Sequence, residues 1–346
     1  MKRTLGRSGI EISAIGLGCW AIGGPHARNG NPVGWGAVND AESIAALKRG
    51  YDLGCTFYDT ADVYGCGHSE IILAEALGHV RDKIVIATKA GYTYVEETRE
   101  APGESGDPDY IRRCCDESLR RLKTDYIDLY QLHWPDRPMR VFHGLEYVHL
   151  DGDAHPIPEI LGALAELVQE GKLRFIGLSN ETPWGLMTFL KAADEHGLSR
   201  IVSIQNAYNL VNRTFEIGLS EVAQRENVSL LGYSPLGQGY LTGKYEGGAL
   251  PPGSRKTLFN RLGRYEKGNG PKAISAYVAL ARNHGLDPAQ MAIAFAVSRP
   301  FVTSTIIGAT TLEQLNTDIA ATELKISDNL LEDINQIHLD YSNPCP

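Results

Sequence analysis

Eight short apolar segments alternate with helical patterns along this chain, and the alternation limits the folds open to it. The segments carry β-branched and aromatic residues and lie at 15–20, 56–61, 84–89, 127–133, 174–180, 201–207, 228–236 and 304–309. Strands that alternate with helices assemble into a parallel sheet. We therefore expect an α/β protein whose sheet is either open and doubly wound or closed into a (β/α)8 barrel.

The intervening segments carry the periodicity and the end signals of helices. In 109–122 the apolar residues share one helical face, and Asp107-Pro108 ahead of them supplies an N-cap and a first-turn proline. Apolar residues likewise share one helical face in 158–170 and in 272–284, and Asp287-Pro288 begins a further helix. These helices would cover the outside of the sheet.

A dinucleotide-binding, doubly wound sheet would carry a glycine fingerprint after its first strand, and this chain lacks it. The stretch GLGCWAIGG has Gly16 and Gly18, but Ala21 stands where the third glycine belongs. No acidic residue follows at a strand end about 20 residues on. Eight units without a break in composition therefore favour one (β/α)8 TIM barrel domain over residues 1–346.

Two further features complete this predicted barrel. The first residues, KRTLGRSGIEISAIGLG, are typical of a β-hairpin before the first barrel strand, and the hairpin would cap the barrel bottom. The connections that follow strands are long, at 21–39, 90–107, 134–156 and 237–271. We expect them to be surface loops over the C-terminal face, where the active sites of such barrels form.

Composition excludes several classes of function. The chain of 346 residues has a net charge of −9 and a pI of about 5.6, which argues against nucleic-acid binding. No window of about 20 apolar residues predicts a membrane span, and the first residues lack the apolar core of a signal peptide. The six cysteines contain no Cys-x-x-Cys pair, so reduced thiols and a cytoplasmic location are expected. The oligomeric state is not indicated.

Ionisable side chains end three successive predicted strands. Side chains alternate along a strand, so Asp59, Lys89 and His133 each share a face with the apolar residues of their own segment. A closed barrel brings the carboxyl ends of its strands together, and Tyr64, just beyond its strand, can fold back over them. We therefore expect Asp59, Tyr64, Lys89 and His133 to form one catalytic group.

This group has the chemistry needed to reduce a carbonyl. The ammonium of Lys89 would lower the pKa of Tyr64, and Asp59 would hold Lys89 in place. The phenol could then give a proton to a carbonyl oxygen that His133 orients. None of these residues can donate a hydride, so a nicotinamide or similar cofactor is required.

Other interpretations stay open at this point. Asp59 and Lys89 could form a structural ion pair inside the barrel, with His133 and Tyr64 as packing residues. Asp59, His68, Glu70 and His133 could instead serve a metal-dependent hydrolase, although the charge of Lys89 would repel a metal ion. We expect no metal site.

Motifs along nearly the whole chain resemble the aldo-keto reductase family. FYDTADVYG, IATKAG and TDYIDLYQLHWPD resemble the strands that carry the family's catalytic residues. GKLRFIGLSN, IQNAYNLVNR, LLGYSPLGQGYLTGKY and STIIGATTLEQLNTDI resemble the later strands and the cofactor loops, in unbroken order. IQNAYNLVNRTFEIGL, TLFNRLGRY and HGLDPAQMAIAF are similar to the bacterial Tas-like subgroup.

The resemblance implies NADP(H)-dependent reduction of an aldehyde or ketone, with Tyr64 as general acid; NADH stays open. A regulatory protein of the same fold that senses nicotinamide nucleotides is the alternative. Carried over by residue, the implied cofactor site comprises Trp20, Asp59, Ser179, Asn180, Gln205, Tyr233, Ser234, Pro235, Leu236, Gly237, Gly239, Leu241, Lys244, Arg255, Gly308, Thr310, Thr311, Gln314 and Asp318.

Within this implied site, Ser179, Asn180 and Gln205 would hold the nicotinamide amide, and Tyr233 would stack on its ring. The residues that would wrap the pyrophosphate are Ser234, Pro235, Leu236, Gly237, Gly239, Leu241, Lys244 and Arg255. Those that would meet the adenosine end are Gly308, Thr310, Thr311 and Gln314. The substrate pocket is expected to comprise Trp35, Tyr64, Tyr92, His133 and Trp134. Asp318 departs from the asparagine of many relatives, and its charge would repel a phosphate that it faced.

Overall fold

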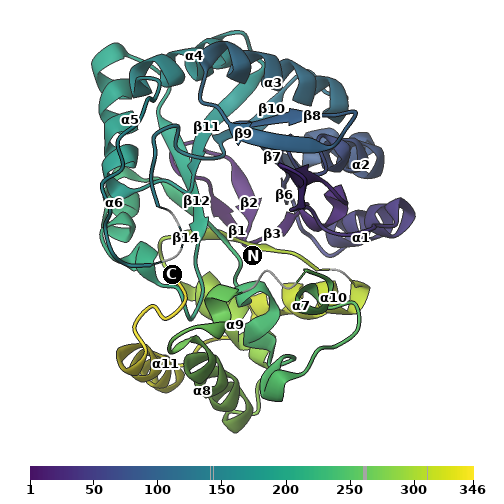
Figure 1. The fold of residues 1–346 in the computed structure, drawn as a ribbon, viewed down its shortest axis with the longest axis vertical. Coiled ribbons are helices and arrows are strands. Elements are labelled where there is room, and N and C mark those ends of the chain that lie inside the picture. Colours follow the sequence, from purple (N-terminus) through teal and green to yellow (C-terminus); the bar gives the residue numbers. More distant parts are fainter. Residues whose placement is uncertain (141, 143, 260–262, 310) are drawn as a thin grey trace.

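Eight parallel strands close into a barrel in the computed structural model, which describes residues 1–140, 142, 144–259, 263–309 and 311–346 (Figure 1). In barrel order they are β3 (Ile15–Gly18), β6 (Phe57–Asp59), β7 (Val85–Ala90), β10 (Ile127–Leu132), β11 (Leu173–Ser179), β12 (Ile201–Ala207), β13 (Ser229–Tyr233) and β14 (Val302–Ile307). Strand β14 pairs in parallel with β3, which closes the sheet. The predicted (β/α)8 barrel is confirmed, and every predicted segment overlaps one of these strands.

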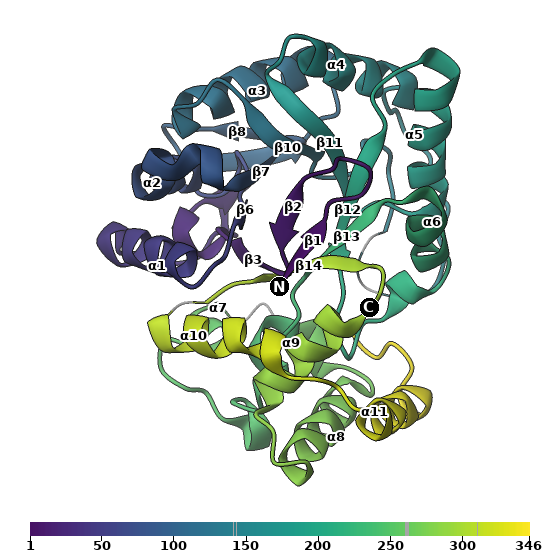
Figure 2. The ribbon, with the colours of Figure 1, turned by 180° about the vertical axis from the view of Figure 1, so that it is seen from behind.

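Helices surround the strands in both views (Figures 1 and 2). They are α1 (Asp40–Asp52), α2 (His68–Leu77), α3 (Pro108–Leu122), α4 (Ile157–Gln169), α5 (Pro183–His196), α6 (Leu219–Glu226), α7 (Arg255–Phe259), α8 (Gly270–Asn283), α9 (Pro288–Ser298), α10 (Leu312–Ala320) and α11 (Asp328–Asp340). The predicted caps form: Asp107 accepts a 2.7 Å bond from the Tyr110 amide at the start of α3, and Asp287 caps α9. No helix in the described parts of the chain is long and apolar enough to cross a bilayer.

The predicted N-terminal hairpin consists of β1 (Lys2–Thr4) and β2 (Glu11–Ser13), which pair antiparallel. Leu5 and Ile12 are fully buried in one apolar cluster with Phe57 of the barrel interior. The Gly6 amide donates a 2.7 Å hydrogen bond to Ser229 Oγ at the first residue of β13. The hairpin therefore closes the barrel at the amino-terminal ends of its strands, opposite the predicted catalytic face.

The long connections are more ordered than the sequence predicted. Two of the segments expected as loops, 21–39 and 90–107, together build a four-stranded sheet in the order β5-β4-β9-β8. Its strands are β4 (Ala27–Arg28), β5 (Asn31–Pro32), β8 (Tyr92–Val95) and β9 (Glu100–Glu104). Ala27 pairs with Glu100, so strands from two different connections share hydrogen bonds. Local sequence patterns cannot show such a pairing, because the partners lie far apart along the chain.

Candidate active site

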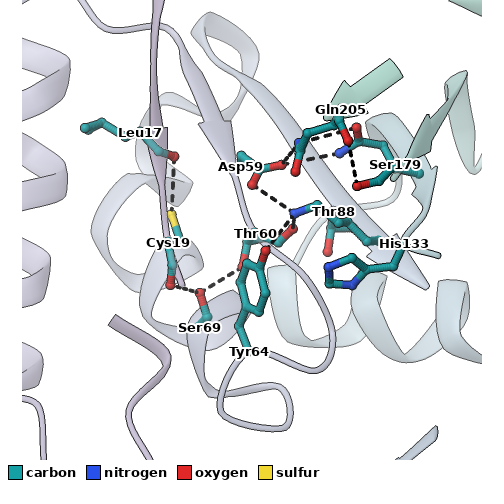
Figure 3. Close-up of polar contacts among 12 residues, drawn as sticks. Leu17, Cys19, Asp59, Thr60, Tyr64, Ser69, Thr88, His133, Ser179 and Gln205 are labelled. Carbon is teal, nitrogen blue, oxygen red and sulfur yellow. Dashed lines mark hydrogen bonds and ion pairs between the residues drawn. The ribbon is translucent and has the colours of Figure 1, made fainter. Parts of the chain in front are cut away.

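Three strand ends place the predicted ionisable residues together at the barrel mouth, the face where the strand-to-helix connections gather. Asp59 is the last residue of β6, Lys89 lies near the end of β7, and His133 follows β10 directly. The strand register sets Lys89 opposite Gln131 of β10. Figure 3 shows Asp59, Tyr64 and His133 converging at this face.

The ammonium of Lys89 is the centre of the site. It is completely buried and lies 2.8 Å from Asp59 Oδ2, 2.7 Å from the Thr60 carbonyl oxygen and 3.2 Å from Tyr64 Oη. Asp59 is also buried, so this ion pair is shielded from water. All three donors of the ammonium thus have an acceptor, which holds the charge beside the phenol.

Two amide side chains hold the second oxygen of Asp59. Gln205 Nε2 donates to Asp59 Oδ1 at 2.7 Å, and Gln131 Nε2 donates to the same oxygen at 3.3 Å. We expected Gln205 at the nicotinamide amide; in this structure its Nε2 serves Asp59, and its contact with nicotinamide stays a prediction. Gln131 was not predicted as a site residue. It lies two residues before His133, so the alternation of side chains along a strand already placed the two on the same face.

The turn that carries Tyr64 packs closely against a neighbouring connection. Gly65 has a φ of 63°, and a Cβ at this position would lie 1.8 Å from the carbonyl oxygen of Gly23. Only glycine fits such a backbone approach without a shift. The chain can therefore turn back immediately after Tyr64, and this turn directs the phenol towards Lys89.

The pKa of Tyr64 moves in the direction opposite to our expectation. Burial raises the pKa of this phenol well above its usual range, and the negative charge of Asp59 raises it further. The prediction of a lowered pKa was wrong, because burial of the phenol has the largest effect on it. The site therefore holds Tyr64 protonated at neutral pH, as a proton donor requires.

His133 is a neutral imidazole in this environment. Burial and the nearby charge of Lys89 lower its pKa well below the usual range. Its Nδ1 is buried without a hydrogen-bond partner among the described residues. The ring meets Tyr64 edge-on at 5.7 Å and Tyr92 at 4.9 Å between centroids. A neutral imidazole can donate one hydrogen bond to a ligand without adding a charge.

The predicted nicotinamide residues lie beside this group. Tyr233 Oη donates to Asn180 Oδ1 at 2.7 Å, and Asn180 Nδ2 donates to the His133 carbonyl oxygen at 3.1 Å. Ser179 Oγ donates to the carbonyl oxygen of Gln205 at 3.0 Å. These hydrogen bonds connect the carboxyl ends of β10, β11, β12 and β13 into one polar network next to Lys89.

The predicted pyrophosphate loop follows β13, and it combines close backbone packing with cationic side chains. Its 3-10 helix η4 (Gly237–Thr242) comprises Gly237, Gly239 and Leu241 of the predicted set, and Ser234, Pro235 and Leu236 precede it. A Cβ at Gly239 would lie 2.8 Å from Lys244 Cε, so the lysine stem lies along this backbone. The ammonium of Lys244 has no hydrogen bond or ion pair with a described residue and lies 5.3 Å from the centroid of the Tyr245 ring.

The aromatic residues of the mouth form two groups rather than one pocket. Tyr92 lies 4.9 Å from His133 and 6.4 Å from Trp134 between ring centroids, and the role of these residues in a substrate pocket stays a prediction. Trp35 instead lies 5.3 Å from Trp20 between ring centroids, and the guanidinium carbon of Arg255 lies 4.4 Å from the centroid of the Trp20 ring. The structure therefore places Trp35 with the predicted cofactor residues Trp20 and Arg255.

At the predicted adenosine end, Gly308 follows β14 and Thr311 caps α10, accepting from the Gln314 amide at 3.2 Å. Thr310 lies outside the described residues. Asp318 is buried, and burial followed by the charge of Asp287 raises its pKa to about 7, against the opposing effect of Lys244. This carboxyl is therefore largely uncharged below neutral pH, which weakens the phosphate repulsion that we expected from it.

Asp318 also predicts a pH-dependent change in stability. In the unfolded chain the carboxyl loses its proton near pH 3.8, whereas in the folded chain it retains the proton to about 7. Between these values the folded state binds more protons, so its stability falls as pH rises. Asp318→Asn should therefore raise the free energy of unfolding near pH 8, by about 4 kcal/mol at most, and change it far less near pH 4. Urea denaturation at both pH values tests this; equal stability of variant and wild type near pH 8 would refute it.

The residues of the metal-hydrolase alternative do not converge. His68 Nε2 lies 2.9 Å from Asp40 Oδ1, away from the strand ends. Glu70 accepts from Arg121 at 2.6 Å and from Thr88 at 2.6 Å, inside the barrel wall. In the part of the chain that the structure describes, no group of three or more His, Cys, Asp and Glu side chains is placed to hold a metal ion.

Comparisons with known proteins identify the family of this chain. The aldo/keto reductase family model matches residues 14–338. Protein tas of Escherichia coli is 43% identical over 98% of this chain and 98% of its own length, and a probable aldo-keto reductase 1 of Glycine max is 31% identical over 95% and 86%. A solved glycerol dehydrogenase from Gluconobacter oxydans superposes with a TM-score of 0.78 at 28% identity, over 96% of this chain and 94% of its own. The protein therefore belongs to the aldo/keto reductase family and is an NAD(P)H-dependent oxidoreductase.

Proposed function

We propose that this enzyme reduces aldehydes or ketones to alcohols with NADPH, and that Tyr64 is the general acid. The contact of Lys89 Nζ with Tyr64 Oη at 3.2 Å carries the proposal. An ammonium in this position stabilises the phenolate that is left when the proton has moved to the substrate. Asp59 keeps that ammonium in place through its 2.8 Å ion pair.

Each residue of the proposed site has a separate role in the reaction. Bound NADPH would supply the hydride to the carbonyl carbon. Tyr64 holds its proton at Oη, because burial raises its pKa, and gives it to the carbonyl oxygen. His133 donates a hydrogen bond to the same oxygen and orients it, and its neutrality avoids a second positive charge beside Lys89. The hydrogen bond from Tyr233 to Asn180 orders the polar network beside which the nicotinamide would lie.

Two features of the barrel mouth support the binding of a dinucleotide. Lys244 offers a cation that no described residue neutralises, and the adjacent Gly239 has a positive φ of 97° in η4. The start of α10, capped by Thr311, points the amides of a helix amino terminus at the end predicted for adenosine phosphate. We further propose that the enzyme prefers NADPH to NADH and that it is located in the cytoplasm.

Titration with NADPH and NADH, followed by protein fluorescence, and then a panel of aldehydes and ketones would test the proposed function. We expect turnover with NADPH across several carbonyl compounds. Alcohol oxidation should be measured in parallel, because one solved relative is titled a glycerol dehydrogenase. Tight binding without turnover on the whole panel would favour a nucleotide-sensing protein, and a clear preference for NADH would overturn the choice of NADPH.

Lys244→Met should weaken the binding of NADPH and of NADH by roughly tenfold, because both nucleotides contain the pyrophosphate. A charge-assisted hydrogen bond to it contributes about 1.5–3 kcal/mol. Lys272→Met provides the control, since Lys272 is an exposed lysine on α8. Dissociation constants from fluorescence titration measure the effect. A loss confined to NADPH would show that Lys244 binds the 2′-phosphate instead.

A further inference from the structure

Arg264 lies where two long connections of the barrel mouth meet. It belongs to the 3-10 helix η6 (Gly263–Glu266), in the connection that follows β13. Its guanidinium carbon lies 4.1 Å from the centroid of the Phe142 ring and 5.8 Å from that of Tyr265. Phe142 belongs to the connection after β10. Arg264 therefore bridges the loop predicted for the cofactor and the loop next to His133.

A series of aromatic contacts leads from Arg264 to the catalytic group. Phe142 lies 5.8 Å from Trp134, Trp134 lies 6.4 Å from Tyr92, and Tyr92 lies 4.9 Å from His133, all between ring centroids. We call Phe142, Trp134 and Tyr92 the aromatic wall. His133 stands at its inner end and Arg264 at its outer end.

The charge of Arg264 also reaches the other side of the mouth. Burial raises the pKa of the Tyr233 phenol, and the positive charge of Arg264 opposes that rise. The same opposing effect acts on Tyr265, whose ring lies 3.2 Å from where a Cβ of Gly237 would be. Arg264 therefore contacts the aromatic wall at Phe142 and lies close enough to Tyr233 for its charge to act on that phenol.

Arg264 has no counter-ion among the described residues, in contrast to Arg28 and Arg137 near the mouth. Arg28, which lies 5.8 Å from the Tyr92 ring, pairs with Glu104 at 3.0 Å. Arg137 donates to Glu181 at 3.0 Å. The guanidinium of Arg264 contacts aromatic rings but makes no hydrogen bond or ion pair with any residue that the structure describes.

An arginine of this kind is suited to an anion that arrives with a ligand. The side chain is partly buried and has lost part of its hydration, while its N–H donors have no hydrogen-bond partner among the described residues. Its planar fork matches a carboxylate in a bidentate contact. The aromatic wall between Arg264 and His133 would accommodate an apolar or aromatic spacer that links the anion to the reacting carbonyl.

We propose that Arg264 binds a carboxylate of the substrate, so that the preferred substrates are aldehydes or ketones that carry a carboxylate separated from the carbonyl by an apolar spacer. This inference rests on the proposed carbonyl reduction. Lys244, nearer to β13 in the same connection, is the cation that we assign to the phosphates of the cofactor.

The test compares two substrates of nearly equal shape, 4-carboxybenzaldehyde and methyl 4-formylbenzoate, of which only the first is charged. We expect wild-type kcat/KM to favour the carboxylate by roughly tenfold or more, as one charge-assisted contact provides. Arg264→Met should bring this ratio close to one, and Arg264→Lys should retain part of it. Arg28→Met is the matched control, because it removes a mouth arginine that already has a partner, and it should keep the wild-type ratio.

Binding to the NADP⁺ complex, measured by calorimetry with the same two aldehydes, separates this inference from the proposed reduction. Equal reduction and equal binding of both aldehydes by the wild type would overturn the carboxylate site and leave the reductase intact. Preferential, Arg264-dependent binding of 4-carboxybenzaldehyde without any turnover would support the site and overturn the reductase. If Arg264→Met weakens NADPH binding but leaves the substrate ratio unchanged, Arg264 serves the cofactor and the inference is wrong.

Discussion

Tyr64→Phe should lower kcat for carbonyl reduction by roughly 10²–10⁴-fold, the usual contribution of a positioned general acid. The variant loses the hydroxyl that lies 3.2 Å from Lys89 Nζ and retains the ring. NADPH affinity should therefore stay close to that of the wild type. Steady-state kinetics of NADPH oxidation and fluorescence titration of NADPH measure the two effects on the same protein.

Tyr94→Phe is a suitable control for this experiment. Tyr94 also has a raised pKa through burial, but its hydroxyl donates to Glu117 at 3.1 Å, away from the catalytic lysine. We expect near-normal kcat and a loss of about 1 kcal/mol in the free energy of unfolding, from one hydrogen bond. If Tyr64→Phe retained kcat within a few-fold of wild type, Tyr64 would not be the proton donor.

Lys89→Met should be the most damaging substitution, because it affects both catalysis and folding. Asp59 would remain buried without its counter-ion, although Gln205 and Gln131 would still donate to it. Breaking a buried pair by removing one partner costs about 3–5 kcal/mol of unfolding free energy. Urea denaturation should show this loss, and kcat should fall by at least roughly 10²-fold because the phenolate loses its stabilising charge.

The double variant Lys89→Met with Asp59→Asn distinguishes the two effects. The uncharged amide no longer needs a counter-ion, so part of the lost stability should return. The ammonium beside Tyr64 is still missing, and kcat should stay low. Recovery of kcat together with stability would mean that Lys89 has only a structural role, as the barrel-interior ion-pair interpretation proposes.

The positions of the proposed catalytic side chains could be predicted from the sequence because they follow from short-range periodicity. Alternation along each strand places Lys89 and His133 on the same face as the apolar residues of their own segments, and a barrel aligns the strand ends. The helix starts at Asp107 and Asp287 were likewise predictable, since an N-cap bonds within its own turn. Thr310 lies outside the described residues, so its predicted contact stays untested.

The environment of these side chains could not be predicted in the same way. The pKa of Tyr64 rises because burial and Asp59 act on it together, and burial depends on which segments cover the mouth. Pairing of β4 with β9 and the contact of Arg264 with Phe142 join residues that are far apart in the chain. No periodicity of the sequence encodes such contacts.

The sequence by itself therefore determined the barrel, its strand order and the identity of the four residues at its mouth, because strand and helix periods are local properties. Only the tertiary structure decided that the pKa of Tyr64 rises rather than falls, that Gln205 and Gln131 hold Asp59, and that Arg264 has no counter-ion among the described residues. Desolvation and charge pairing depend on every group that packs around an atom, and that arrangement exists only in the folded chain.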